Sequence, residues 1–256
     1  MPDALHLRSL PNFRDIGGVP TRDGQRLTKG RVFRSERPHR IASADRVHLE
    51  TLGVGLVIDL RTAADRTRNP AASIGRAHVR SIPLHEDPAF DIGLGHLARF
   101  LASEEGEARF RAFVAHYYRH LAHERAPQIG VAISAIARAS EPVWIHCTAG
   151  RDRTGMLVAI AQSALGVPED VVLAGFRETD LRYAVRLDRL RRVLRAITLL
   201  RVPDARIRAV LRCQSETLAE VLTELSSRHG SIEGYVREAC GVDDATFAAL
   251  RSSLIR

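Results

Sequence analysis

The sequence has a single lysine, Lys29, and few aromatic residues, which make up 5% of its 256 residues. Its three cysteines, Cys147, Cys213 and Cys240, form neither a CxxC pair nor the ligand spacing of a zinc site. We therefore expect no metal and no cofactor. An odd number of separated cysteines without a secretory signal favours a reducing compartment, the cytoplasm, and leaves export without a signal open. No apolar run reaches the roughly 18 residues that a membrane-spanning helix needs.

Arginine carries almost all of the basic excess. The formal net charge is +8 at pH 7, from 38 lysines and arginines against 30 aspartates and glutamates. Codon usage explains such a bias as readily as function does. A functional explanation would be an anionic partner: a phosphate ester, an acidic membrane surface or a nucleic acid. Because aromatic residues are few and no basic run alternates with them, we expect no nucleic-acid partner.

Short apolar runs alternate with segments of helical spacing along the first two thirds of the chain. The runs predict strands, and the segments between them predict helices. In the first helix, Ser43 is expected to be the N-cap and Gly53 to end the helix. Gly17–Gly18 and Asp23–Gly24 are typical of turns in a small hairpin. The expected strands cover residues 31–34, 54–62, 78–84 and 142–147, and the expected helices cover 43–53, 95–124, 127–140 and 154–168.

This order of elements is typical of an α/β fold. We expect a central, mostly parallel, twisted sheet flanked by helices. Residues 169–256 are rich in arginine and have helical spacing, so they would add a helical C-terminal region. The whole chain, 1–256, is expected to form one domain. Residues 143–165 would then pass from strand to loop to helix at the carboxyl end of the sheet, where ligands bind in open α/β folds.

The segment VWIHCTAGRDRTG, residues 143–155, places a cysteine at the base of this loop. The small residues Thr148, Ala149 and Gly150 allow successive backbone amides to converge on one anion, beside the positive end of the helix dipole. Amides, dipole and arginine charge together favour the thiolate of Cys147. A thiolate beneath a bound phosphate would be an in-line nucleophile.

Three further side chains would complete the site. Arg153 provides a planar fork that matches two phosphate oxygens. Thr154 could donate its hydroxyl to the cysteine sulfur, and His146 could hold the loop through hydrogen bonds to the backbone. The plain alternative is a buried cysteine beside solvated arginines, but the spacing H-C-x5-R-T-G at a strand-to-helix turn favours a site. The nucleoside-triphosphate motif G-x4-G-K-[ST] is absent.

The spacing H-C-x5-R-[ST] is the signature of the cysteine-dependent protein tyrosine phosphatase superfamily. Residues 146–155 resemble the loop of its atypical bacterial branch, and NFRDIGG (12–18), RVFRS (31–35) and IDLRT (58–62) resemble blocks of that branch in the same order. The resemblance covers residues 8–180 and implies a tyrosine-phosphatase-like fold. It also implies a phosphatase that acts through a phosphocysteine intermediate on phosphotyrosine, phosphoserine, phosphothreonine and phosphoinositides.

The resemblance also implies which loop residues contact a phosphorylated protein or lipid substrate. The branch carries a lysine, tied to phosphoinositide recognition, where this chain has Arg151. Arginine keeps the charge and can grip a phosphate in a bidentate way, but its reach differs. The substrate-binding residues implied are Thr148, Ala149, Gly150, Arg151, Thr154 and Gly155.

Hydrolysis needs an acid that protonates the leaving group. The better-known members of the superfamily take an aspartate from a separate mobile loop. The resembling branch uses an aspartate inside the loop, which corresponds to Asp152. Asp59, at the end of a predicted strand, competes with it, and it could equally be a hydrogen-bond anchor for the backbone. Asp87 and Asp91 are weaker candidates on a loop.

Two other functions could use such a loop. A non-catalytic phosphate-binding or phosphoinositide-binding module would not need the thiolate of Cys147. An arsenate reductase would need resolving cysteines near the site, and Cys213 and Cys240 are distant in sequence. Those two are expected to be small buried hydrophobic residues. A disulfide with Cys147 as redox protection stays open.

Several residues outside the loop are expected to have structural roles. Arg14 and Asp15 would form an ion pair that braces the loop. Arg34 and Ser35 would support the floor of the site. Tyr117–Tyr118 would pack within a helix.

Residues 186–213 predict two amphipathic helices divided at Pro203. One functional interpretation is a helical lid over the site, which the resembling branch carries. Another is a basic face for transient contact with a membrane surface. The plain alternative is a solvated helical pair with arginine on its outer face. Nothing in the sequence indicates the oligomeric state.

Overall fold

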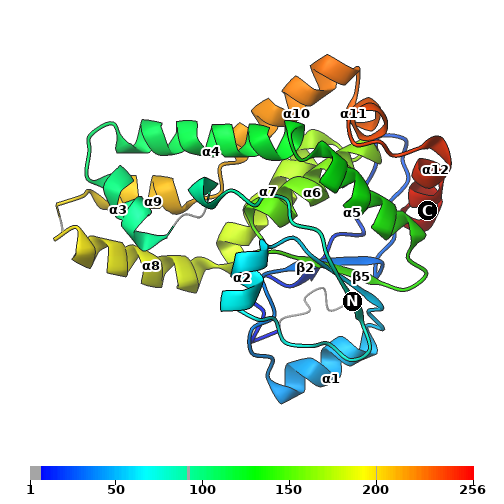
Figure 1. Cartoon of the computed structure of the whole chain (residues 1–256), viewed down its shortest axis with the longest axis horizontal. Helices are drawn as coiled ribbons and strands as arrows, with labels where there is room; N and C mark the ends of the chain where they lie inside the picture. The colour runs from blue at the N-terminus through cyan, green and yellow to red at the C-terminus, as the bar shows by residue number, and fades with distance from the viewer. Residues whose placement is uncertain (1–6, 91–92, 200) are drawn as a thin grey trace.

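The computed structural model describes residues 7–90, 93–199 and 201–256. Its strands are β1 (Arg14–Asp15), β2 (Val32–Ser35), β3 (Leu56–Asp59), β4 (His78–Ser81) and β5 (Val143–His146). They form one five-stranded sheet in the order β1–β2–β5–β3–β4. β2, β5, β3 and β4 are parallel, and β1 is antiparallel to β2 at one edge (Figure 1). The expected α/β fold with a mostly parallel sheet is confirmed.

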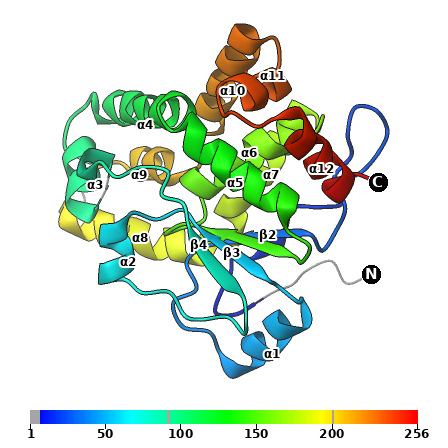
Figure 2. The ribbon, with the colours of Figure 1, turned by 45° about the vertical axis from the view of Figure 1, so that its right-hand side comes forward.

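The strands β2, β3 and β5 are buried on both faces, so that successive side chains, which point to opposite faces, enter two different clusters, whereas the edge strand β4 is exposed. Trp144 of β5 packs edge-on against Phe13, with ring centroids 5.1 Å apart, in a cluster that includes Leu49 of α1 (Ser43–Thr51). The next residue, Ile145, belongs to the larger cluster on the other side. Figure 2 shows α1 on one side of the strands and α5 (Ala126–Arg138) on the other. Two-sided burial explains the unbroken apolar runs in the sequence.

The larger cluster joins the sheet to helices from the second half of the chain. α6 (Asp152–Ala164) lies beside α5 over the same face, and α7 (Glu169–Arg182) packs against α6. The C-terminal helices pack outside this layer: α12 contacts α5, α11 contacts α6, and α10 contacts α7. Their bounds are α10 (Ser215–His229), α11 (Ile232–Glu238) and α12 (Asp244–Leu254).

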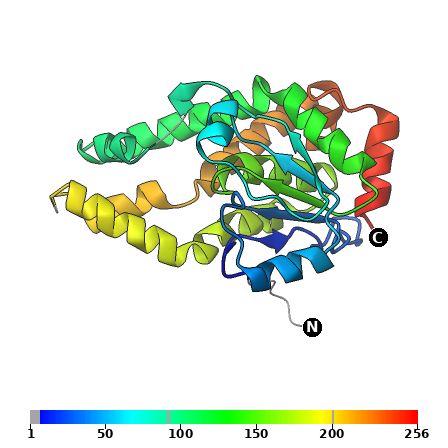
Figure 3. The same cartoon turned by 60° about the horizontal axis from the view of Figure 1, so that its bottom comes forward.

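The remaining helices extend away from the sheet on the side where its strands end. α3 and α9 lie between α4 and α8, and together they form an arm that projects from the body of the molecule (Figures 1 and 3). α8 and α9 confirm the prediction of two helices divided at Pro203. The bounds are α2 (Ala63–Arg68), the 3-10 turn η1 (Pro88–Phe90), α3 (Leu94–Leu101), α4 (Gly106–His123), α8 (Ala184–Ile197) and α9 (Asp204–Leu211).

Several expected boundaries were wrong. The strands expected at 54–62 and 78–84 end at Asp59 and Ser81, and the helix expected to reach residue 168 ends at Ala164. Ala42 is the N-cap of α1, since its backbone is extended and Ser43 is already helical. The helix expected from residue 154 begins at Asp152, where a carboxylate suits the positive end of the helix dipole. Residues 95–124 form two helices, because the chain turns sharply before Gly106, whose missing Cβ would lie 1.4 Å from the carbonyl oxygen of Phe100.

Gly130 marks a close approach between α5 and the C-terminal helices. A Cβ there would lie 1.9 Å from the carbonyl oxygen of Cys240, whereas the space around Gly175 of α7 is open within 4 Å. We expect Gly130→Ala to lower the free energy of unfolding by about 1–3 kcal/mol, because the backbone must move. Gly175→Ala, the matched control, should raise it by about 0.5–1 kcal/mol, because alanine favours the helix. Denaturant unfolding measures both, and an unchanged stability of Gly130→Ala would contradict the close packing.

Candidate active site

The loop after β5 begins where the ends of three parallel strands meet. His146 pairs in register with Ser35 of β2 and with Asp59 of β3. Cys147 follows directly, 2% exposed, and the loop runs into α6 at Asp152. The strand, loop and helix expected from the sequence are therefore present at the carboxyl end of the sheet.

Buried donors hold two carbonyl groups of the loop on its outer side. The Tyr183 hydroxyl donates to the carbonyl oxygen of Ala149 at 2.7 Å. Asn12 Nδ2 donates to the carbonyl oxygens of both Ala149 and Gly150, at 3.1 and 3.2 Å. Arg34 Nη2 donates to Gly150 at 2.6 Å, which confirms the expected supporting role of Arg34. These bonds fix the orientation of the loop peptides.

The outward carbonyls turn a backbone amide towards the cysteine. The carbonyl of Ala149 and the N–H of Gly150 belong to one trans peptide, so they point in opposite directions. The Gly150 amide donates to Cys147 Sγ at 3.2 Å. Gly150 has φ +63°, and a Cβ there would lie 2.1 Å from the carbonyl oxygen of Ser35. Only glycine fits this position, and its amide is a donor that favours a thiolate.

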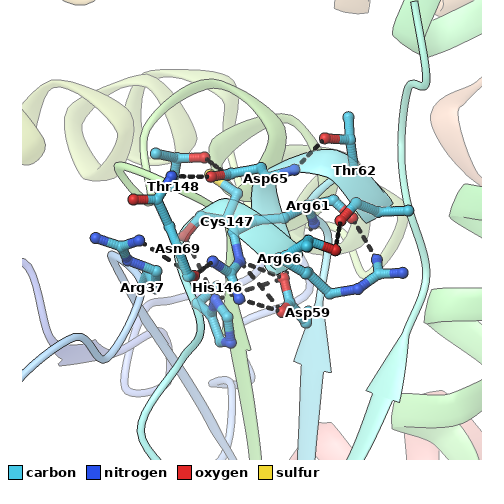
Figure 4. A network of polar contacts seen from close by, with 12 residues as sticks. Arg37, Asp59, Arg61, Thr62, Asp65, Arg66, Asn69, His146, Cys147 and Thr148 are labelled. Carbon is cyan, nitrogen blue, oxygen red and sulfur yellow. Dashed lines mark hydrogen bonds and ion pairs between the residues drawn. The ribbon is translucent and has the colours of Figure 1, made fainter.

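Arg153 is connected to α2 through Thr148. Its Nη2 donates to Thr148 Oγ1 at 2.9 Å. That hydroxyl donates to Asp65 Oδ2 at 2.5 Å, as Figure 4 shows. Burial opposes ionisation of Asp65, but hydrogen bonds from Thr148 and Asn69 hold its pKa below the ordinary value. Burial also opposes the charge of Arg153, but the negative charge of Cys147 and other neighbours raises its pKa. Nη1 of Arg153 is buried and has no hydrogen-bond partner among the described residues, so it is available to an anion.

Asp152 is held on both sides. Its Oδ1 accepts a hydrogen bond from the Tyr118 hydroxyl at 2.7 Å, and its Oδ2 accepts one from Arg151 Nε at 3.2 Å. The charge of Asp152 raises the pKa of Arg151. Arg151 Nη1 also donates to the carbonyl oxygen of Leu211, at the end of α9, at 3.1 Å. Tyr118 packs in the core as expected, and the hydrogen bond to Asp152 is a further role that the sequence did not indicate.

Asp59 pairs in register with His146 and is not among the residues that line the cavity with Cys147 and Asp152. It forms a buried ion pair with Arg61, whose Nη2 lies 2.8 Å from Asp59 Oδ2 (Figure 4). Burial works against ionisation, but the hydrogen bonds and the charge of Arg61 hold the pKa of Asp59 below its usual range. This geometry fits the anchor interpretation of Asp59.

The other expected partners of the loop have weaker contacts with it. His146 Nδ1 lies 3.4 Å from the carbonyl oxygen of Cys147, and burial lowers the pKa of His146 to about 4. Thr154 Oγ1 is buried without a hydrogen-bond partner in the described part of the chain. The sulfur of Cys147 accepts the amide of Gly150 instead of the expected hydroxyl. Gly155 packs against Phe176, whose ring a Cβ would approach to 2.4 Å.

The expected ion pair between Arg14 and Asp15 was wrong, because neighbouring side chains of a strand point to opposite faces. Arg14 Nε lies 3.5 Å from Glu178 of α7, and its Nη2 donates to Thr179 at 3.1 Å. Asp15 accepts the backbone N–H of Gly30 at 2.6 Å.

The sequence offered two weaker acid candidates, Asp87 and Asp91. Asp87 accepts the N–H of Ala89 at 2.8 Å in the turn before η1. Asp91 lies outside the described residues.

A cavity of about 460 Å³ opens over the loop. Its floor includes Cys147, Thr148 and Arg153, and the carboxylates of Asp65 and Asp152 also line it. Its walls come from η1, α3, α4, α8 and α9 and are mainly apolar and aromatic. They include Phe90, Phe113, Tyr117, Leu190, Val210 and Leu211.

The three cysteines are free and buried. The described residues hold no group of three or more His, Cys, Asp or Glu side chains that could bind a metal ion. None of the helices formed by residues 7–90, 93–199 and 201–256 is long and apolar enough to cross a membrane.

Comparison with known proteins identifies the family. A model described as the tyrosine phosphatase family matches residues 5–256. The chain belongs to the tyrosine phosphatase family. This phosphatase is 30% identical over 242 residues to a protein of Cupriavidus necator named as a tyrosine-protein phosphatase, across 94% of this chain and 85% of that protein. It is 27% identical over 280 residues to the triple specificity protein phosphatase PtpB of Mycobacterium tuberculosis, across 98% of this chain and 100% of that protein.

Among solved structures, the crystal structure of P. aeruginosa TpbA aligns with 60% of this chain and 71% of its own, at 19% identity and a TM-score of 0.32. The expected membership of the tyrosine phosphatases is thus confirmed on sequence. The protein is a phosphatase of the tyrosine-phosphatase type.

The sequence did not predict the contacts that four residues make with the phosphatase loop. Asn12 lies inside a block that resembles the family, but its contacts with the loop were not expected. Asp65, Tyr118 and Tyr183 stand in segments without a recognisable local pattern. Each reaches the loop from a separate helix or its end, so only the fold brings them to it.

Glu36 lies buried beneath the phosphatase loop, where its Oε2 accepts the N–H of Asn12 at 3.1 Å. Burial raises the pKa of Glu36 from 4.5 to about 7. The folded state then binds more protons than the unfolded state between these values, so stability falls as the pH rises from about 4.5 to 7. Glu36→Gln keeps an acceptor and removes the charge. We expect it to match the wild type at pH 5 and to be more stable by about 3 kcal/mol at pH 8.

Denaturant unfolding at both pH values measures this difference. Comparing the two pH values cancels any effect of the substitution that does not depend on pH. An equal pH dependence in the wild type and Glu36→Gln would show that Glu36 does not gain a proton on folding.

Proposed function

We propose that the phosphatase hydrolyses phosphate monoesters through a phosphocysteine intermediate on Cys147. The observation that carries this proposal is the convergence of two donors around the cysteine at the floor of the cavity: the Gly150 amide and Nη1 of Arg153, which has no hydrogen-bond partner in residues 7–90, 93–199 and 201–256. These donors match a bound phosphate, with Arg153 gripping two of its oxygens. The Cys147 thiolate attacks phosphorus in line with the leaving oxygen.

We assign the acid role to Asp152. As the S–P bond forms and the P–O bond to the leaving group breaks, Asp152 gives its proton to the leaving oxygen. Water then attacks phosphorus, the S–P bond breaks, and Asp152 takes a proton from that water as inorganic phosphate is released. Asp152 lines the cavity with Cys147, whereas Asp59 is bound to Arg61. Asp65 also lines the cavity, but its hydrogen bonds hold it ionised, which suits an anchor better than an acid.

Phosphotyrosine is the substrate that the cavity supports best. Its walls offer an aromatic side chain the rings of Phe90, Phe113 and Tyr117, whereas phosphoserine would leave much of that surface uncovered. A phosphoinositide would need further cations for its additional phosphates. Arg151 is already bound to Asp152 and to the carbonyl of Leu211, which leaves fewer cations for a second phosphate. We therefore propose phosphotyrosine as the main substrate, with phosphoserine, phosphothreonine and phosphoinositides as slower ones; the name of the mycobacterial relative, a triple specificity phosphatase, supports this breadth.

We further propose that residues 1–256 act as one phosphatase domain in which 186–213 is a lid. Leu190 of α8 and Val210 and Leu211 of α9 line the same cavity as Cys147, which supports this role. Substrate exchange would then require α8 and α9 to move. The free thiols support a reducing, cytoplasmic location.

The outer face of α8 supports transient contact with an anionic membrane surface. Val185 is 79% exposed and Ile197 is 51% exposed, and Val193 is also exposed. Arg189 and Arg192 lie on the same exposed side of the helix. Exposed apolar side chains between arginines suit an interface with acidic lipids rather than water alone.

Cys147→Ser should abolish turnover of p-nitrophenyl phosphate and retain binding of a phosphotyrosine peptide, because serine keeps the site but is a poor nucleophile. Cys240→Ser, at a buried free thiol on the far side of the fold, is the control and should keep normal turnover. Chelators should not affect the wild type. Turnover by Cys147→Ser close to the wild-type rate would contradict the intermediate, and a wild type that binds without turnover would point to a phosphate-binding module.

Aspartate-to-asparagine variants at positions 152, 65 and 59 should separate the acid from the anchors. Asp152→Asn should slow esters of poor leaving groups, such as phenyl phosphate, by about a hundredfold or more and barely affect activated aryl esters. Asp65→Asn and Asp59→Asn should change all esters by a similar factor. The measurement is kcat/KM against leaving-group pKa for each variant. A steeper dependence in Asp59→Asn or Asp65→Asn, but not in Asp152→Asn, would reassign the acid.

The wild type should sediment with phosphatidylserine vesicles and not with phosphatidylcholine vesicles. The double variant Arg189→Gln/Arg192→Gln should weaken that binding by about tenfold or more. Val185→Asp should weaken it too, whereas Val131→Asp, at an exposed apolar residue of α5, is the control and should not. Equal binding to both kinds of vesicle, or an equal effect of Val131→Asp, would contradict a membrane face on α8.

A further inference from the structure

The two carboxylate oxygens of Asp152 have partners of different kinds. Oδ1 accepts the hydroxyl of Tyr118, a residue of α4 that is 1% exposed. Oδ2 accepts Nε of Arg151, a loop residue that itself lines the cavity. The two oxygens are therefore not equivalent as sites for a proton.

Tyr118 restricts where that proton can be. Among the described residues, Asp152 Oδ1 is the one acceptor of the Tyr118 hydroxyl. A proton on Oδ1 would have to be donated to the tyrosine oxygen, and the hydroxyl hydrogen would then be left buried without an acceptor. A proton on Oδ2 leaves the Tyr118 bond intact, because a carboxyl oxygen that accepts from Arg151 still has a second lone pair.

The position of Tyr118 is itself fixed by packing. Its ring meets Phe176 of α7 edge-on, with centroids 6.4 Å apart, and lies beside Tyr117 at 6.1 Å. Tyr118 thus connects the rigid core to a carboxylate on the first residue of α6. A half-turn flip of the protonated Asp152 carboxyl group would place the protonated oxygen against Tyr118. The Tyr118 hydroxyl would then lose its acceptor, and this loss opposes the flip.

We propose that Tyr118 is a positioning residue that keeps the acid proton of Asp152 on Oδ2. The inference rests on the proposed role of Asp152 as the acid. In this arrangement the leaving oxygen of the substrate approaches Oδ2 from the cavity, while Oδ1 stays bound to the core. Arg151 moves with the loop, so Tyr118 is the contact that orients Asp152 relative to the rest of the fold.

Tyr118→Phe removes the hydroxyl and keeps the ring. We expect kcat/KM for phenyl phosphate to fall about tenfold and that for an activated aryl phosphate to change less than about twofold, because only poor leaving groups need the acid. The alkaline limb of the kcat profile should move to higher pH, because the carboxylate loses a donor that favours its charged form. Tyr235→Phe is the matched control. Its buried hydroxyl donates to the carbonyl of Ala122, away from the loop, and its loss should leave the leaving-group dependence unchanged.

A double-mutant cycle separates positioning from packing. If Tyr118 acts through Asp152, Tyr118→Phe should have almost no further effect on phenyl phosphate in the Asp152→Asn background. An equal loss for all esters that persists in that background would show that Tyr118 only packs, and no loss for phenyl phosphate would equally overturn the proposal. If Asp152→Asn alone leaves the leaving-group dependence unchanged, the acid assignment has failed and the role of Tyr118 fails with it. That result differs from one in which Asp152→Asn behaves as expected and only Tyr118→Phe does not.

Discussion

The geometry of the site depends on the hydrogen bonds that hold two loop carbonyl groups, those of Ala149 and Gly150, on the outer side of the loop. The N–H of Gly150 faces the sulfur because the carbonyl of Ala149, in the same peptide, is bound to Asn12 and Tyr183 on the other side. Further hydrogen bonds connect Asn12 to parts of the fold that lie away from the loop. Asn12 Oδ1 accepts a hydrogen bond from Arg14, which is bound in turn to α7. An anion nest that is itself made of flexible small residues is thus held rigid by buried side chains from distant segments.

Part of the arginine excess is structural. Arg34 and Arg61 are almost fully buried, and they bind a loop carbonyl and a carboxylate respectively. Burial lowers the pKa of Arg34 to about 10, so the side chain stays charged at neutral pH. A high net charge therefore does not translate directly into a binding surface. The charges that face the proposed partners include the exposed arginines of α8, such as Arg189 and Arg192, and the guanidinium of Arg153 at the floor of the cavity.

The sequence predicted the features that are local. The glycine and arginine spacing of the loop and the apolar runs of the strands follow from short-range rules, so the sheet and the position of Cys147 were correct. The contacts of Tyr118, Tyr183 and Asp65 join residues that lie far apart in the chain, and no periodicity marks them. The pattern also could not tell whether Asp59 faces the cavity or the backbone, because that depends on Arg61 folding back onto it. The role of Trp144, the one tryptophan of the sequence, also depends on a contact between separate segments: its indole N–H donates to Ser35 of the neighbouring strand, beneath the loop.

The most direct test of the account is to trap the covalent intermediate. The wild-type phosphatase would be mixed with p-nitrophenyl phosphate, quenched in acid within the first turnover and digested, and the peptides analysed by mass spectrometry. The account predicts a phosphate adduct on the peptide that contains Cys147, localised to that residue, and its disappearance when the substrate is exhausted before the quench. A rapid burst of product without any adduct on Cys147, or an adduct on another residue, would contradict it.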